Sequence, residues 1–183
     1  MAHRMVGFLC VGHLVTDINQ GALPALLPFL ISEYHLSYTA AAFIIFCSNI
    51  ASTVVQPLFG HLADRTLKPW LMPAGIVLAG TGIAAVGIVS DYVWVLAAVM
   101  VSGIGVAAFH PQGAQFVSRV AGEKKATAMS VFGVGGTLGF AIGPIIITAA
   151  VLHWGLKGSA ILIFPAGLVA VLLACQLSFG SGG

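Results

Sequence analysis

Residues 11–28 read VGHLVTDINQGALPALLP and lie inside an apolar segment long enough to cross a lipid bilayer. The stretch nonetheless carries the polar side chains of His13, Asp17, Asn19 and Gln20. Because His13, Asp17 and Gln20 are spaced four and three residues apart, a helix places them on one face. A charged side chain near the middle of a membrane helix costs about 3 kcal/mol or more, so it normally faces a bundle interior or a wet cavity. The stretch therefore predicts a membrane helix with one polar face.

Two interpretations of Asp17 follow from this position. In the first, Asp17 belongs to a polar stripe that lines a transport pathway, where it gains and loses a proton. In the second, Asp17 is a buried structural group whose hydrogen bonds are satisfied by a neighbouring helix. Ionisable groups inside a membrane are functional candidates by default, which favours the first interpretation.

The composition is that of an integral membrane protein. Of the 183 residues, 59% are hydrophobic and only 7% are charged, and the mean hydropathy is +1.06. A soluble domain carries about 25% charged residues. The net charge of +2 comes without a basic cluster, so no nucleic-acid partner is expected.

Six apolar segments are close to or longer than the length of about 20 residues that a spanning helix needs. They are residues 5–31, 40–62, 71–89, 93–117, 126–152 and 159–176. The fold class predicted is an all-α membrane protein, with one six-helix transmembrane bundle over residues 1–176. Residues 177–183 end in the run SFGSGG, which is rich in small residues, and they are predicted to form a flexible tail or linker.

The basic residues predict the orientation in the membrane. Six of the seven lie before the first segment, between the second and third, or between the fourth and fifth: Arg4, Arg65, Lys68, Arg119, Lys124 and Lys125. Lys157 alone lies on the other side. The positive-inside rule therefore places the N-terminus in the cytoplasm, and six spans return the C-terminus there.

Polar residues inside two other segments predict a cavity. Asn49 and Gln56 lie close to one face of the second segment. His110 lies in the fourth segment directly before Pro111, where the proline is expected to disrupt the helix locally. Gln20, Asn49 and Gln56 are therefore candidates for lining a substrate cavity.

The titratable groups within the membrane are chiefly Asp17, His13 and His110, because every Lys and Arg lies in or beside a loop. Histidine changes charge near neutral pH, so these groups are candidates for proton coupling. The alternative for His13 is a helix-end histidine that is hydrogen-bonded to backbone. His13 and Asp17 could also supply two metal ligands, but no third is evident nearby, so neither a metal nor a cofactor is expected.

The fifth segment is rich in small residues. Gly135, Gly139 and Gly143 follow one another at intervals of four, and Pro144 comes next. Such a run allows two membrane helices to approach closely. Helix packing is therefore the preferred role for these residues over direct contact with a ligand.

Residues 60–69, GHLADRTLKP, resemble the G-x-L-A-D-R-x-G-R-K signature of the major facilitator superfamily. Gly60, Asp64 and Arg65 are among the matching positions, whereas Leu67 replaces a glycine. The resemblance implies a cytoplasmic latch, in which Asp64 contacts a helix N-terminus of an opposite bundle and pairs with Arg119.

Two longer stretches, GHLVTDINQGALPALLPFL and GIGVAAFHPQGAQ, resemble the fosmidomycin-resistance subgroup of that superfamily. The run from Gly139 to Pro144 is similar to part of the family's antiporter motif, but Val99 stands where the family has a proton-relay arginine. The resemblance implies proton-coupled export of fosmidomycin or other drugs across a bacterial inner membrane, with Asp17 and His110 at the coupling site.

A complete member of this superfamily has twelve spanning helices in two halves, so the chain resembles the N-terminal half. The expected partners are protons, a small-molecule drug, lipid, and either a C-terminal half or a second copy. Two alternatives remain, namely a half-domain that does not transport and a uniporter or importer of a small metabolite. No nucleophile–base set or phosphate loop is present, so an enzyme is not expected.

Overall fold

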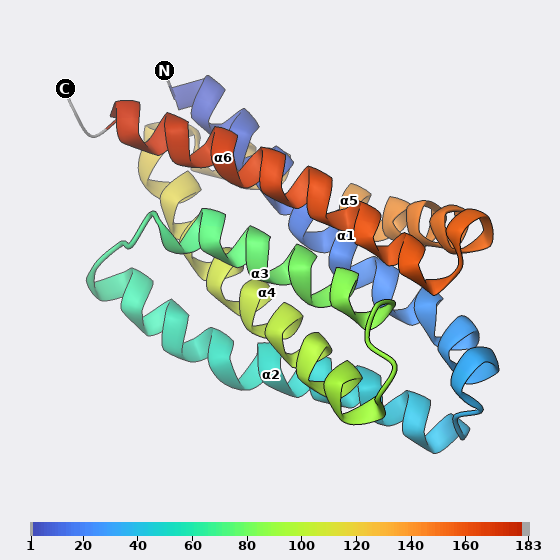
Figure 1. The fold of residues 1–183 in the computed structure, drawn as a ribbon. Helices are drawn as coiled ribbons and strands as arrows, with labels where there is room; N and C mark the ends of the chain where they lie inside the picture. The colour runs from blue at the N-terminus through green and yellow to red at the C-terminus, as the bar shows by residue number, and fades with distance from the viewer. Residues whose placement is uncertain (1, 181–183) are drawn as a thin grey trace.

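The computed structural model describes residues 2–180, and these form α-helices and short 3-10 helices without any strand. The bounds are α1 Ala2–Tyr34, α2 Tyr38–Arg65, α3 Leu71–Val86, α4 Tyr92–Val120, η1 Gly122–Lys124, α5 Lys125–Trp154, η2 Leu156–Leu162 and α6 Ile163–Gly180. The all-α fold class is therefore confirmed, and the helices pack side by side as an elongated bundle (Figure 1).

Within residues 2–180, five helical stretches are long and apolar enough to span a membrane. These contain α1, α2, α4, α5 and α6. The third helix, α3, was expected over residues 71–89 but ends at Val86 after 16 residues. At 1.5 Å per residue it is about 24 Å long, which is shorter than the hydrocarbon core of about 30 Å. The helix ends at Gly87, where an added Cβ would collide with the Leu156 carbonyl oxygen.

The predicted tail is wrong in its first four residues, because α6 continues through Gly180. The helix extends because Leu177 still packs against a buried apolar cluster of the bundle. The sixth segment also differs at its start, since η2 occupies residues 156–162 before the α-helical geometry begins. Residues 181–183 of the predicted tail lie outside the described residues.

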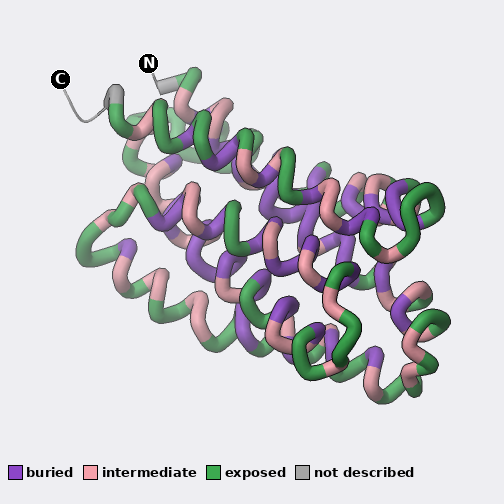
Figure 2. The backbone as a smooth tube through the Cα atoms, in the orientation of Figure 1, coloured by how far each residue is buried: buried purple, intermediate pink, exposed green. Residues whose placement is uncertain are grey.

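Two pairings organise the bundle. The α1 and α5 helices lie side by side, and α3 and α4 form the second close pair. The α4 helix also packs against α2, while α3 packs against α6. Buried positions gather on the central helices, whereas much of α2 is exposed or half-buried (Figure 2). The α3 helix has few polar residues and packs against both α4 and α6. It therefore acts as a scaffold for the bundle.

Glycines set the spacing of both close pairs. An added Cβ at Gly75 of α3 would lie 2.6 Å from the Gly105 carbonyl oxygen of α4. On α5, added Cβ atoms at the predicted packing positions would collide with consecutive turns of α1. The pairs are Gly135 with the Cys10 carbonyl, Gly139 with the Leu14 carbonyl, and Gly143 with the Ile18 carbonyl. Because both sets of numbers rise together, α1 and α5 run parallel.

Candidate functional site

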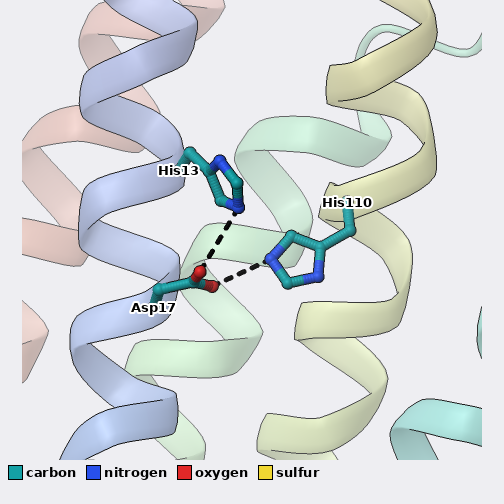
Figure 3. Close-up of side chains that lie close together, drawn as sticks. All are labelled: His13, Asp17 and His110. Carbon is teal, nitrogen blue, oxygen red and sulfur yellow. Dashed lines mark hydrogen bonds and ion pairs between the residues drawn. The ribbon is translucent and has the colours of Figure 1, made fainter. Parts of the chain in front are cut away.

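Three polar side chains from two helices meet inside the bundle (Figure 3). His13 and Asp17 project from consecutive turns of α1, and His110 reaches them from α4. The Nε2 atom of His110 lies 2.8 Å from Asp17 Oδ1, and the Nε2 atom of His13 lies 3.3 Å from Asp17 Oδ2. Each carboxylate oxygen therefore faces one imidazole ring.

The cluster is shielded from solvent without being sealed. The side chains of His13 and Asp17 are 14% and 12% exposed, and that of His110 is 20% exposed. No Lys or Arg takes part in an ion pair with Asp17 among residues 2–180. The histidines are therefore the groups that offset the negative charge of the carboxylate, and they can do so only by donating or carrying a proton.

The α5 helix completes the site with groups that the sequence did not single out. The carbonyl oxygen of Phe132 lies 2.8 Å from His13 Nδ1. The Phe132 ring also stacks on the His13 ring with a centroid separation of 4.1 Å. At Gly136, an added Cβ would lie 2.5 Å from His13 Nε2 and 2.7 Å from Asp17 Oδ2. A backbone carbonyl and a glycine without a side chain have no recognisable sequence motif. Their role is therefore visible only from their position opposite α1 in the structure.

His13 thus combines features of both expectations raised by the sequence. It lies in the middle of α1 rather than at a helix end. One ring nitrogen is hydrogen-bonded to backbone, as in the structural alternative, while the other faces Asp17.

The same three side chains lie close enough together to coordinate one metal ion, since one ligand atom from each lies within 4.8 Å of the others. The third ligand that the local sequence lacked, His110, comes from α4. Hydrogen bonding alone accounts for the arrangement, and the absence of a metal or cofactor stays a prediction.

The other cavity candidates do not join this cluster. Gln20 is half-buried on α1, and Asn49 is exposed on α2. Gln56 lines a separate open groove of about 440 Å³ between α2 and α4, together with Thr53, Pro57, Gly60 and Pro111. Pro111, which lines this groove, directly follows His110 in α4, whereas none of His13, Asp17 and His110 lines it.

The α4 helix continues through Pro111 from Tyr92 to Val120, so the local disruption expected at the proline does not end the helix. A proline removes one backbone donor from a helix. Packing of α4 against both α2 and α3 supports the turns on either side of it.

The predicted latch residues lie around the α2–α3 connection. Asp64 and Arg119 are both exposed, and they form no ion pair in the described part of the chain. Arg119 instead donates to the Ala63 carbonyl at 3.4 Å, and Asp64 accepts from Gln115 at 3.3 Å. The expected ion pair is therefore wrong here, although α4 still contacts this connection. Arg65 is exposed beside Asp64.

Gln112 is a further anchor of this connection. Its side chain is fully buried, and its Oε1 accepts from the Lys68 backbone N–H at 3.1 Å. Its Nε2 has no partner within residues 2–180. The segment after α2 is thus tied to α4 two residues beyond His110.

Replacing Gln112 with leucine is expected to loosen the α2–α3 connection. The change removes the acceptor of the Lys68 N–H, and such a hydrogen bond contributes about 0.5–1.5 kcal/mol. Transient opening should therefore rise about twofold to tenfold, and limited trypsin digestion should cut faster after Arg65. Mass spectrometry of the fragments measures this rate. Gln176→Leu makes the same chemical change on α6 and should leave the cleavage rate at Arg65 unchanged; equal rates in the two variants would refute the anchoring role.

Comparisons with known proteins agree with these features. The family model of the Major Facilitator Superfamily matches residues 9–179. The fosmidomycin resistance protein of Escherichia coli (strain K12) is 28% identical over 174 residues, which are 95% of this chain and 43% of that protein. An uncharacterized MFS-type transporter, YfnC of Bacillus subtilis (strain 168), is 30% identical over 161 residues, which are 88% of this chain and 39% of that protein. The chain thus spans less than half the length of these relatives, and it belongs to the Major Facilitator Superfamily of membrane transporters.

Proposed function

We propose that this chain forms one bundle of a proton-coupled exporter of small molecules, with His13, Asp17 and His110 as its coupling site. The observation that carries the proposal is the position of Asp17, whose side chain is 12% exposed and faces histidines from two different helices. A carboxylate held in this way can take up and release a proton while the surrounding helices stay apolar.

The proposed cycle is antiport by alternating access. Protons from the periplasmic side load the cluster, the bundle rocks against a second bundle, and the drug leaves as the protons enter. Gln56 lines the groove between α2 and α4 that includes Pro111, the residue after His110, and this groove would hold the substrate contact. Gln20 and Asn49 would contact substrate only at surfaces that a second bundle completes.

The proposed substrate class follows from the relative in Escherichia coli, whose name is fosmidomycin resistance protein. Fosmidomycin is an anionic phosphonate, and none of the basic Lys or Arg residues contacts the cluster in the described helices. A protonated histidine or a second bundle would therefore supply the positive charge that binds it.

We also propose that all six helices cross a bacterial inner membrane, with both termini in the cytoplasm. The six basic residues on one side support this orientation. The polar side chain of Asn49 is exposed in the middle of α2, where lipid would leave its amide unsatisfied. A C-terminal half or a second copy of this chain would cover that face.

Fosmidomycin susceptibility tests the proposed function. Efflux-deficient bacteria would express this chain alone, or together with the second half of the Escherichia coli relative. We expect protection that disappears when a protonophore collapses the proton gradient. Protection by the chain alone would indicate a dimer, and protection only with the second half would indicate a two-half transporter.

The controls separate the rival functions. Flux that ignores the proton gradient would favour a uniporter over an antiporter. No protection in either arm, with the protein present in the membrane, would refute the fosmidomycin assignment and leave only the membership of the superfamily.

A further inference from the structure

The contacts of His13 restrict where its protons can reside. A backbone carbonyl oxygen can only accept a hydrogen bond. Because the Phe132 carbonyl lies 2.8 Å from His13 Nδ1, this nitrogen must carry a hydrogen for the bond to form. The ring can then gain or lose a proton only at Nε2, which lies 3.3 Å from Asp17 Oδ2.

Two residues of α5, one turn apart, hold the ring in this orientation. The Phe132 ring stacks on the His13 ring at an interplanar angle of 23°. This contact fixes the plane of the His13 ring, in addition to the hydrogen bond that fixes the position of its Nδ1 atom. Gly136 lies against the opposite edge, where any side chain would occupy the space between His13 Nε2 and Asp17 Oδ2. Phe132 sets the direction of the ring, and Gly136 leaves room for the contact with the carboxylate.

We propose that Phe132 and Gly136 are positioning residues that fix His13 as the Nδ1–H form, so that His13 Nε2 and Asp17 Oδ2 share one exchangeable proton. The inference deepens the proposed function and rests on it, because the shared proton has a role in transport only if the chain is part of a proton-coupled exporter. When the proton is present it forms the hydrogen bond between the two atoms. When it is absent, a lone pair of nitrogen faces a carboxylate oxygen, and the contact between His13 and Asp17 is lost.

The other groups around His13 leave this assignment intact. His110 of α4 is the titratable neighbour from another helix, and it contacts the other oxygen, Asp17 Oδ1, at 2.8 Å. On α1, Cys10 directs its thiol to the Val131 carbonyl at 3.2 Å. The α3 helix approaches α1 at Gly12 through Ile76 and has no titratable side chain. The α5 helix faces the ring with Phe132 and Gly136.

Nitrogen NMR of the whole chain in lipid nanodiscs tests the proposal. The chain would be labelled with ¹⁵N-histidine, and the His13 signals would be identified by their loss in His13→Gln. At every pH at which the protein stays folded, we expect Nδ1 to remain protonated, so that any proton gained or lost by the ring is gained or lost at Nε2. A neutral ring protonated at Nε2 instead of Nδ1 would overturn the proposal.

Matched glycine variants test the role of α5. Gly136→Ala should convert the single neutral form of His13 into a mixture of both forms, because the new methyl group displaces the ring. Gly133→Ala lies on the same helix with nothing within 4 Å of its added Cβ, and it should keep the single form. Equal spectra from the two variants would overturn the positioning role of Gly136.

A second variant keeps the test decisive if Gly136→Ala fails to fold. Phe132→Leu retains the backbone carbonyl but removes the stacked ring, and it too should give a mixture of forms. An unchanged single form in Phe132→Leu would overturn the role of the ring. The measurement needs no transport, so a fixed Nδ1–H form together with proton-independent export would refute the proposed function while the positioning stands.

Discussion

Asp17→Asn is expected to reduce proton-driven export to the level of cells that lack the protein. Asparagine has nearly the same shape as aspartate, but its amide does not take up a proton in the physiological range. If Asp17 carries the coupling charge, the bundle loses its response to the proton gradient. Drug susceptibility and proton flux into vesicles, each with the amount of membrane protein measured, check this result.

The geometry explains why this variant should still fold. The introduced carbonyl oxygen can accept from His110 Nε2, as Asp17 Oδ1 does now at 2.8 Å. The introduced amide nitrogen can donate to His13 Nε2, because Nδ1 of that ring carries the hydrogen bonded to Phe132. Both hydrogen bonds of the cluster therefore survive without the charge, and thermal stability should change little.

A second carboxylate provides the matched control. Asp91 accepts from the Val93 backbone N–H at 2.8 Å as the N-cap of α4, outside the cluster. Asparagine caps a helix about as well as aspartate, so Asp91→Asn should export normally. Proton-dependent export that persists in Asp17→Asn would rule out Asp17 as the coupling residue.

Most of the helical architecture was predictable from the sequence because apolar runs of bilayer length have few other structures open to them. Predicted and observed ends of α1 to α5 differ by three residues or fewer, and the largest of these differences in α3 lies at Gly87, where the helix ends early. The exception is α6, which begins after η2 and stays helical beyond its expected end because Leu177 packs on the core.

The candidate site was partly predictable for a related reason. The four-residue spacing of His13 and Asp17 follows from helix geometry alone. The meeting of Asp17 with His110 depends on how α1 packs against α4, which no local pattern encodes. Phe132 and Gly136 contribute a carbonyl, a ring face and an empty space, and such features have no sequence signature. The expected pairing of Asp64 with Arg119 is not formed in the structure, where Asp64 accepts from Gln115 and Arg119 donates to the Ala63 carbonyl.

Gly139→Ala is expected to destabilise the bundle more than a typical surface substitution. The added Cβ would collide with the Leu14 carbonyl oxygen and lie 2.9 Å from its carbonyl carbon. These are backbone atoms of a rigid helix, so α1 and α5 must move apart. Overpacking of this kind costs about 1–3 kcal/mol, which equals or exceeds the gain of about 1 kcal/mol from replacing glycine by alanine in a helix, and a collision with rigid backbone favours the larger cost.

Gly133→Ala separates these two contributions on the same helix. Its added Cβ has nothing within 4 Å, so it gains helix propensity without a collision and should unfold at the same temperature as the parent or higher. Gly139→Ala should unfold at a lower temperature in detergent micelles. Equal unfolding temperatures for the two variants would contradict close α1–α5 contact. A lower value for Gly139→Ala would also predict weaker export, because the same separation of α1 from α5 pulls His13 away from the Phe132 carbonyl.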